Sequence, residues 1–232
     1  MRYAIYFTPP SSDALLRVAA NWLGRDAFSG EPVRRPAICA LAAEEIAKLT
    51  EEPGRYGFHA TLKAPFRLAE TADEGGLLSA LMHFASSTAP VTIPCLKVRM
   101  HGSFFALVPE MPVPEVDQLA NDVVVRFDRF RAPLNAAEIA RRRPERLNAV
   151  QRHNLERWGY PSVFEEFRFH MTLTGPVEEK DRPRIARILD EFFAPVLAEP
   201  VEIANLALFV EPEPGAPFEV HSLHPLTGGR KS

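Results

Sequence analysis

One four-residue pattern occurs twice in this chain, once in each half. The first copy is His59-Ala60-Thr61-Leu62 and the second is His170-Met171-Thr172-Leu173. Apolar and polar residues alternate around both copies, as they do in a β-strand that buries one face. Because successive side chains of a strand point to opposite faces, each His and the Thr two residues later are expected on the same side. The chain is therefore expected to form two strands that each present an imidazole and a hydroxyl.

The alternation also indicates which face of each strand is buried. In both runs the apolar residues fall on one face, and the His and Thr fall on the other. Lys63 continues the polar face of the first run, and Arg168 belongs to the polar face of the second. These two cations are candidates for contact with an anionic group held between the histidines, because an ammonium or a guanidinium stabilises negative charge.

The composition is that of a folded protein with a sizeable core. The chain has 232 residues, of which 46% are hydrophobic and 25% are charged, enough for one large domain or two closely packed lobes. The formal net charge of -3 provides no general positive field, which disfavours a protein that binds long nucleic acids. A small phosphorylated substrate or a nucleic-acid end remains open, because a local basic cleft needs few Arg or Lys residues.

Cysteine usage and hydropathy favour a cytoplasmic protein. Cys39 and Cys95 lie in apolar surroundings and lack the spacing of a metal site or redox pair, so we expect buried thiols in a reducing compartment. The apolar run at the N-terminus is too short for a secretory signal, and no stretch approaches the roughly 18 apolar residues of a membrane span. We expect no membrane contact, and nothing in the sequence indicates an obligate protein partner.

The periodicity of apolar residues predicts an α+β protein. Besides the two motif runs, strands are expected at 2–8, 91–100, 104–109, 201–210 and 218–223. A 3.6-residue spacing predicts helices at 15–23, 40–49, 77–86, 116–127 and 185–196. Pro53-Gly54 is expected to end the second of these helices before the first motif.

The segment 131–162 is more polar than its surroundings and contains Arg141-Arg142-Arg143-Pro144. A charge run of this kind is commonly a solvated face or helix end. The alternative is a lid that brings Arg and aromatic contacts to an anionic substrate. The sequence leaves both interpretations open.

Paired His and Thr side chains suit acid/base chemistry at phosphorus. Imidazole titrates near neutral pH, so one His can accept a proton while the other donates one. A Thr hydroxyl can donate a hydrogen bond to a phosphoryl oxygen. The remaining histidines lack the His-x-Thr context, and no metal-ligand cluster, Gly-rich phosphate loop or G-x-S-x-G sequence occurs. No metal and no cofactor are expected. Alternatively, the motif residues are structural and reflect ordinary β propensity.

Two tyrosines are further candidates for substrate contact. Tyr6 shares a face of the first strand with Ala4, opposite the apolar Tyr3, Ile5 and Phe7, and either lines a cleft or packs in the core. Tyr56 lies just before the first motif, within reach of a group bound there.

These runs resemble a known family. The paired His-x-Thr-Leu motifs resemble those of the 2H phosphoesterase superfamily. More narrowly, YGFHATLKAPF at 56–66, RWGYP at 157–161 and FRFHMTLTG at 167–175 are similar to the DUF1045 group. Members of that group are labelled phosphonate-metabolism proteins because they are encoded near carbon-phosphorus lyase genes. The resemblance covers nearly the whole chain.

The resemblance implies one bilobal domain over residues 1–232, with a pseudo-two-fold pair of antiparallel sheets lining a central cleft and helices outside. It also implies a metal-independent mechanism. One of His59 and His170 would activate water, the other would protonate the departing oxygen, and Thr61 and Thr172 would hold the non-bridging oxygens. Which His has which role stays open, because the pseudo-symmetry does not orient the substrate.

The leading hypothesis is a phosphodiesterase that opens a small cyclic phosphate or a related diester. A ribose cyclic phosphate from phosphonate breakdown is the substrate suggested by analogy with the group. One alternative is an RNA-end 2',3'-cyclic phosphodiesterase or ligase that uses the basic segment to hold a longer strand. Another is a non-catalytic protein that binds a phosphorylated ligand.

Overall fold

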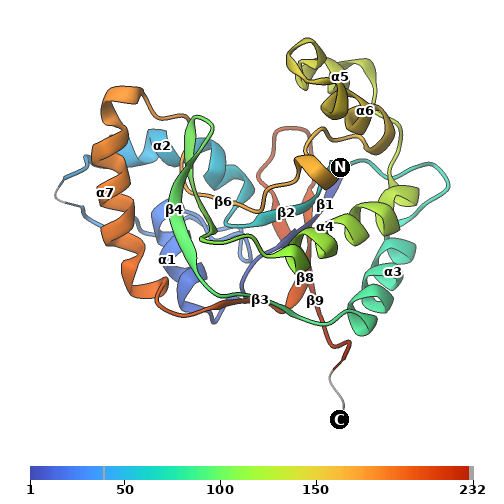
Figure 1. The fold of residues 1–232 in the computed structure, drawn as a ribbon, viewed down its shortest axis with the longest axis horizontal. Helices are drawn as coiled ribbons and strands as arrows, with labels where there is room; N and C mark the ends of the chain where they lie inside the picture. The colour runs from blue at the N-terminus through green and yellow to red at the C-terminus, as the bar shows by residue number, and fades with distance from the viewer. Residues whose placement is uncertain (39, 230–232) are drawn as a thin grey trace.

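A seven-stranded antiparallel sheet forms the centre of the protein (Figure 1). The computed structural model describes residues 1–38 and 40–229. Within them the strands of the main sheet follow the order β4-β5-β6-β2-β1-β8-β9, and β3 and β7 form a separate two-stranded sheet. The strands are β1 (Arg2–Phe7), β2 (Ala60–Phe66), β3 (Val91–Ile93), β4 (Leu96–His101), β5 (Phe104–Pro109), β6 (Met171–Thr172), β7 (Val201–Ile203), β8 (Asn205–Glu211) and β9 (Glu219–Pro225).

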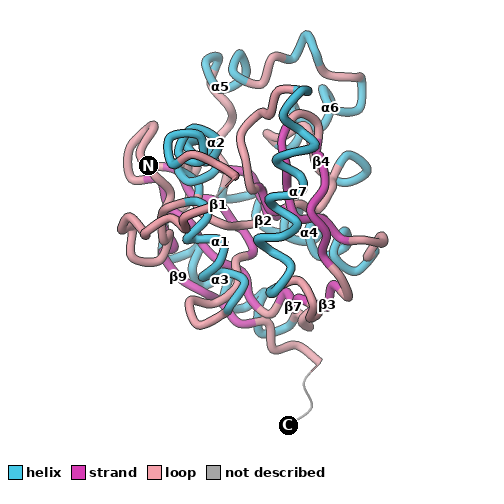
Figure 2. Tube along the Cα trace, turned by 90° about the vertical axis from the view of Figure 1, so that its left-hand side faces the viewer, coloured by secondary structure: helices cyan, strands magenta, loops and turns pink. Residues whose placement is uncertain are grey.

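Helices surround this sheet, and two of them stand apart from it. The α-helices are α1 (Ala14–Leu23), α2 (Ala43–Tyr56), α3 (Glu74–Ser87), α4 (Pro114–Phe127), α5 (Ala136–Arg141), α6 (Ala149–Trp158) and α7 (Arg182–Phe193). Short 3-10 turns are η1 (Asp128–Phe130), η2 (Pro144–Arg146), η3 (Phe164–Glu166), η4 (Glu179–Asp181) and η5 (Ala194–Val196). In Figure 1, α1, α2 and α7 lie on one side of the molecule and α3 and α4 on the other, while α5 and α6 protrude above. The turned view in Figure 2 also shows α5 standing out from the rest.

The α+β class predicted from the sequence is confirmed. The arrangement of the strands differs in one respect from the expected pair of sheets. Strands β4-β5-β6 and strands β2-β1-β8-β9 join edge to edge and form one sheet. The join is between β2 and β6, where Ala60 pairs with Met171. The two motif strands are therefore neighbours in the middle of one sheet, and each histidine lies directly before its strand, His59 before β2 and His170 before β6.

The second motif forms less strand than its alternation predicts. Only Met171 and Thr172 are in β6, paired with Leu107 and Ala106 of β5. Beyond them the ladder changes, because the Thr174 hydroxyl accepts the N–H of Phe105 at 3.0 Å. A side chain thus takes the place of a backbone carbonyl, and regular pairing ends.

Helix α2 runs through the Pro53-Gly54 pair that was expected to end it and continues to Tyr56. Proline cannot donate to the carbonyl four residues earlier, which here belongs to Leu49. That carbonyl instead accepts the N–H of Gly175 at 2.6 Å. The missing helix bond is therefore replaced by a tertiary one, which ties α2 to the residue after the second motif.

Two long strands predicted from the sequence are each divided in the structure. The 91–100 run breaks at Pro94-Cys95 into β3 and β4, and the 201–210 run breaks at Ala204 into β7 and β8. β3 and β7 pair with each other in the separate small sheet. Cys95 is half-buried rather than fully buried, and Cys39 lies outside the described residues.

Both faces of β1 are buried, in two separate clusters. Tyr3, Ile5 and Phe7 belong to the large core shared with the outer helices. Ala4 and Tyr6 belong to a smaller cluster with residues of β8 and the β8–β9 connection. The division matches the alternation of the first strand and directs Tyr6 toward the face that carries the cavity described below. None of the helices among the described residues is long and apolar enough to cross a membrane.

Candidate active site

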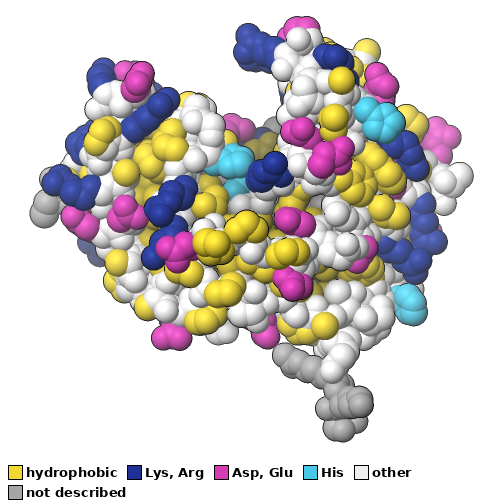
Figure 3. All heavy atoms as spheres, in the orientation of Figure 1, with side chains coloured by type: hydrophobic (Ala, Val, Ile, Leu, Met, Phe, Trp, Pro, Cys, Tyr) yellow, Lys and Arg dark blue, Asp and Glu magenta, His cyan; other side chains and the backbone are white. Residues whose placement is uncertain are grey.

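Both motifs open onto one cavity of about 320 Å³. His59, Thr61, His170 and Thr172 all line it. In Figure 3 histidine side chains are visible in the hollow between the two halves, with Lys or Arg side chains beside them. The cavity therefore brings together the four motif residues predicted from the sequence.

His59 is oriented by the end of α2. Gly57 ends that helix with φ 76°, a conformation that glycine adopts without strain, and its carbonyl accepts a hydrogen bond from Nδ1 of His59 at 2.9 Å. A carbonyl only accepts, so Nδ1 carries the proton and Nε2 of the neutral ring is left as an acceptor. The Tyr6 ring stacks on this imidazole with centroids 3.9 Å apart and planes at 21°. Burial lowers the pKa of His59 to about 4.

His170 is held in the same local way. Its Nδ1 donates to the carbonyl of Arg168, again two residues earlier, at 2.7 Å. Its Nε2 is thus the nitrogen left to accept or donate a proton. Burial is the largest cause that lowers the pKa of His170, and His101 adds to it. Both imidazoles are therefore mainly neutral at pH 7.

The two motif threonines have hydroxyls available for a ligand. Thr61 and Thr172 are half-buried and line the cavity. Within residues 1–38 and 40–229 neither hydroxyl makes a hydrogen bond to protein. The neighbouring Thr174 differs, because its hydroxyl is bonded to Phe105 and Gly175.

Both candidate tyrosines reach the cavity. Tyr6 is 1% exposed, so it packs in the core and lines the site at the same time. Burial raises the pKa of Tyr6 well above its usual value, and the phenol stays neutral. Tyr56 stacks on Phe218 with centroids 5.1 Å apart and carries the Arg55 guanidinium over its ring at 4.3 Å.

Lys63 does not line the cavity, contrary to the expectation from strand alternation. The pairing of β1 with β2 passes from Tyr6–Thr61 to Ile5–Lys63, so β2 has one extra residue there. Such a bulge shifts the alternation by one position. Lys63 consequently faces α4, where its Nζ lies 3.3 Å from the Val124 carbonyl and 3.4 Å from an Asp128 carboxylate oxygen.

A second bulge in β2 follows immediately and directs the next residues of the strand toward the cavity. From Ile5–Lys63 to Tyr3–Phe66 the strand β2 again has one extra residue. Ala64 and Pro65 both line the cavity as a result. Proline is tolerated at such a position because a bulged residue need not donate to the ladder.

Arg168 also lies away from the cavity. Its guanidinium donates to the carbonyls of Glu165 and Phe167 and is exposed. It lines a separate groove with residues that include Met111 and Asp117. The structure thus places neither cation of the two motif strands beside the histidines.

Other cations line the cavity instead, and they come from the 131–162 segment and from the start of β1. Arg141 and Arg142, at the end of α5, line it together with Arg2. The Arg142 guanidinium lies 4.7 Å from the centre of the Tyr160 ring. Within the described residues neither Arg141 nor Arg142 is paired with a carboxylate. Arg2 shares a face with Tyr6 by strand alternation, and that signal would have identified it.

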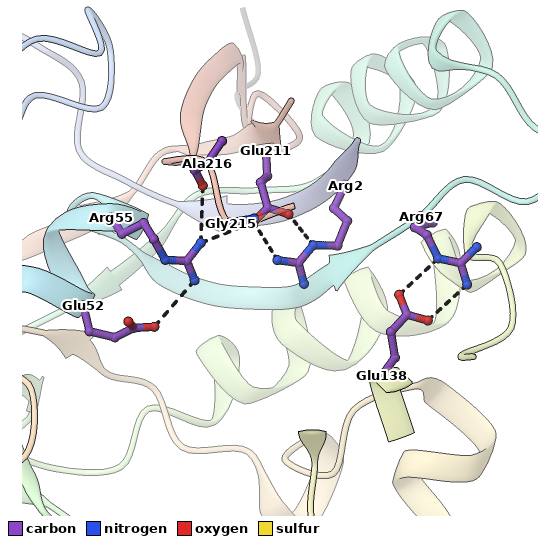
Figure 4. Close-up of polar contacts among 8 residues, drawn as sticks. All are labelled: Arg2, Glu52, Arg55, Arg67, Glu138, Glu211, Gly215 and Ala216. Atoms are coloured by element: carbon purple, nitrogen blue, oxygen red, sulfur yellow. Dashed lines mark hydrogen bonds and ion pairs between the residues drawn. The ribbon is translucent and has the colours of Figure 1, made fainter. Parts of the chain in front are cut away.

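Ion pairs fix the position of Arg2 and of the helix α5 that carries Arg141 (Figure 4). The carboxylate of Glu211 is fully buried and pairs with both Arg2 and Arg55. Beside them, Arg67 and Glu138 form two hydrogen bonds of 3.1 Å that connect the end of β2 to α5. Arg55 also pairs with Glu52 at 3.5 Å, so the charges of Arg2 and Arg55 are balanced by Glu211 and Glu52. Among the described residues, the unpaired positive charge of the cavity lining comes from Arg141 and Arg142.

The 131–162 segment folds through local capping. Asn135 and Glu138 form a capping box at α5, and Asn148 and Gln151 form another at α6. These reciprocal bonds explain how a polar segment with little buried surface forms two helices. Among residues 1–38 and 40–229 no group of three or more His, Cys, Asp or Glu side chains is placed to hold a metal ion.

Comparison with known proteins agrees with the sequence resemblance. The family profile described as "Protein of unknown function (DUF1045)" matches residues 61–219. This chain belongs to the DUF1045 family. The match includes the second motif and all of the 131–162 segment, and it begins at Thr61 of the first motif.

Two curated relatives of this DUF1045 protein carry the name ribose 1,5-bisphosphate phosphokinase PhnN. The one from Janthinobacterium sp. (strain Marseille) is 40% identical over 231 residues, covering 98% of this chain and 51% of the relative. The one from Laribacter hongkongensis (strain HLHK9) is 38% identical over 223 residues, covering 95% and 50%. The chain therefore spans about half the length of the curated relatives that it matches.

Two solved structures are similar to this chain at low sequence identity. The crystal structure of the protein TT0787 of Thermus thermophilus gives a TM-score of 0.46 at 15% identity, covering 99% of this chain and all of the other. A structure titled "Crystal structure of phosphoesterase" gives a TM-score of 0.41 at 12% identity, covering 97% and 98%.

Proposed function

We propose that this DUF1045 protein is a metal-independent phosphodiesterase of the 2H type, acting on a small cyclic phosphate or a related diester. The observation that carries the proposal is the matched geometry of His59 and His170. Each donates from Nδ1 to the carbonyl two residues earlier and leaves Nε2 for chemistry, in one shared cavity. Each also has an available Thr hydroxyl two residues further on.

In the proposed reaction the Nε2 of one neutral histidine takes a proton from water, whose oxygen attacks phosphorus. The P–O bond to the departing oxygen breaks, and the other histidine, as imidazolium, gives that oxygen a proton. Thr61 and Thr172 donate hydrogen bonds to the non-bridging oxygens. A bound phosphodiester anion raises the pKa of the histidine beside it, which favours the imidazolium form that the reaction needs.

Burial lowers the pKa of both histidines, and the assignment of their roles rests on the rings that enclose His59. His59, whose pKa falls to about 4, lies among the aromatic rings of Tyr6, Tyr56 and Phe209. Such surroundings disfavour its charged form, so we assign His59 as the base that activates water. His170 is then the acid that protonates the leaving oxygen.

The arginines of α5 support an anionic substrate. Arg141 and Arg142 line the same cavity as the histidines, and the Arg67–Glu138 pair fixes the helix that carries them. We therefore propose that 131–162 is a lid whose guanidinium groups hold the substrate. A guanidinium suits a phosphoryl group because it donates two parallel hydrogen bonds.

A ribose cyclic phosphate is the proposed substrate class. The relatives' name refers to a phosphorylated ribose, and that name describes proteins about twice as long as this chain. Phosphokinase activity is not part of the proposal, because the sequence contains no G-x-x-x-x-G-K-[ST] phosphate loop.

A substrate screen tests the proposal. The purified chain would be incubated with ribose cyclic phosphates, cyclic nucleotides and RNA with 2',3'-cyclic ends, and the position of the product phosphate recorded. We expect turnover of small cyclic phosphates that persists in the presence of chelators. Preference for long RNA ends with steep salt dependence would favour the RNA-processing alternative. Tight binding without any turnover would favour the ligand-binding alternative.

A further inference from the structure

A second histidine lies against His170, outside the motif. His101, the last residue of β4, stacks its ring on that of His170 with centroids 4.4 Å apart and planes at 16°. The hairpin of β4 and β5 brings it to the motif strand, and Phe104 on the other arm contacts both imidazoles, with ring centroids at 5.3 and 5.9 Å.

This contact repeats the arrangement at the other histidine. His59 has a stacked ring from Tyr6 and a tilted contact from Phe209, and His170 has a stacked ring from His101 and a tilted contact from Phe104. Each imidazole is held by one hydrogen bond, from its Nδ1 to a backbone carbonyl. A ring held by a single hydrogen bond can still tilt about that bond. A second ring stacked parallel to the imidazole prevents this tilt.

We propose that His101 is a positioning residue for His170, whose stacked ring fixes the plane in which Nε2 of His170 faces the cavity. The inference rests on the proposed function, because it concerns the same reaction. A displacement of about 1 Å in a reacting group lowers a rate by up to about 100-fold, so a residue that fixes a ring plane has a measurable effect.

His101 also lines a groove that carries charge. Arg168, Glu110 and Asp117 line that groove with His101, and His170 is the titratable group on the cavity side. Burial and the neighbouring Arg168 lower the pKa of His101, which keeps its ring neutral at pH 7. At lower pH a protonated His101 would oppose protonation of His170, and a phenyl ring at the same position would not.

Two substitutions separate a positioning role from simple packing. His101→Ala removes the ring, while His101→Phe keeps a flat ring that cannot titrate. His83→Ala is the matched control, because His83 is exposed on α3 and does not line the cavity. Turnover of a cyclic phosphate would be measured across pH, and the ring nitrogens of His170 would be observed by NMR in each variant.

We expect His101→Ala to lower kcat by about 10-fold or more with KM within about 2-fold of wild type. His101→Phe should recover most of that kcat and move the limb of the pH profile that belongs to His170 to higher pH. The NMR signals of His170 should report one fixed ring orientation in wild type and averaging between orientations in His101→Ala.

Three results would overturn the inference. These are a His101→Ala enzyme as active as the His83→Ala control, a His101→Phe enzyme as impaired as His101→Ala, or NMR signals of the His170 ring that do not respond to His101→Ala. The NMR result needs no turnover. It therefore decides the positioning role even if no cyclic phosphate is hydrolysed, an outcome that would contradict the proposed function instead.

Discussion

Tyr6 and His59 lie face to face, with ring centroids 3.9 Å apart, where the antiparallel strands β1 and β2 meet. The register pairs Tyr6 with Thr61, which places the phenol ring beside the whole first motif. A core residue thus also forms part of the cavity wall. The stability of the protein and the orientation of His59 are therefore coupled at this position.

Tyr6→Ala and Tyr6→Phe should differ sharply. Removing a fully buried ring leaves a void, and we expect Tyr6→Ala to lower the free energy of unfolding by roughly 3–5 kcal/mol and to reduce turnover. Tyr6→Phe keeps the ring and should retain most of both. Urea unfolding and turnover of a cyclic phosphate provide the two measurements. Equal stability of the two variants would contradict the packing role of the ring.

The pH dependence of stability should carry a signature of His59. The pKa of His59 falls from 6.5 to about 4 on folding, so between these values the unfolded chain binds a proton that the folded protein does not. The contribution of neutral, buried His59 to the free energy of unfolding is fully present above pH 6.5 and decreases as the pH is lowered toward 4. We expect urea unfolding between about pH 7 and pH 4.5 to show a shallower loss for His59→Gln than for wild type. Identical slopes would show that His59 is not buried in neutral form.

The buried Glu211 should contribute far more to stability than an exposed acid. Glu211→Gln leaves Arg2 and Arg55 without their shared carboxylate, and we expect a loss of roughly 3 kcal/mol in the free energy of unfolding. Glu110→Gln is the control, because Glu110 pairs with Lys97 at the surface with both side chains over 40% exposed. That change should alter stability by less than about 0.5 kcal/mol. Similar effects of the two substitutions would be inconsistent with the burial of the Glu211 pair.

The Arg67–Glu138 pair should affect substrate binding more than folding. Arg67→Gln removes the contact between β2 and α5 and loosens the helix that carries Arg141 and Arg142. Because the Arg67 side chain is 40% exposed, the free energy of unfolding should change by less than about 1 kcal/mol. KM for the cyclic phosphate should rise several-fold while kcat changes little. An unchanged KM would argue against a lid that holds the substrate.

The acid and base assignment predicts different responses to the leaving group. A p-nitrophenolate leaves without protonation, so His170→Ala should retain much more activity on a p-nitrophenyl phosphodiester than on a ribose cyclic phosphate. His59→Ala should be impaired on both, because water still needs a base. If His59→Ala, and not His170→Ala, retained activity on the p-nitrophenyl phosphodiester, the assignment of base and acid would have to be exchanged.

Alternation along the strands was sufficient to predict the four motif residues of the cavity and the faces of β1. It failed at Lys63, because each bulge inserts one residue and nothing in the local pattern marks the insertion. The continuation of α2 past Pro53 was equally hidden. It depends on Gly175, far along the chain, whose N–H donates to the Leu49 carbonyl that Pro53 leaves without a helix partner.

The residues missed around the cavity were those that tertiary structure brings there. His101 reaches His170 only because the β4–β5 hairpin lies beside β6, and a turn sequence alone does not report that neighbour. The arginines of α5 were visible as a charge run, but whether the run faced solvent or the cavity depended on the Arg67–Glu138 contact. Arg2 was the exception, since its alternation with Tyr6 already placed it on the cavity face.

The most direct test of the central claim is turnover of a ribose cyclic phosphate by His59→Ala and His170→Ala, with circular dichroism as a check of folding. If the two imidazoles act as base and acid, each variant should fold and lose at least about 100-fold in kcat. Hydrolysis at near wild-type rate by either folded variant would contradict the two-histidine mechanism.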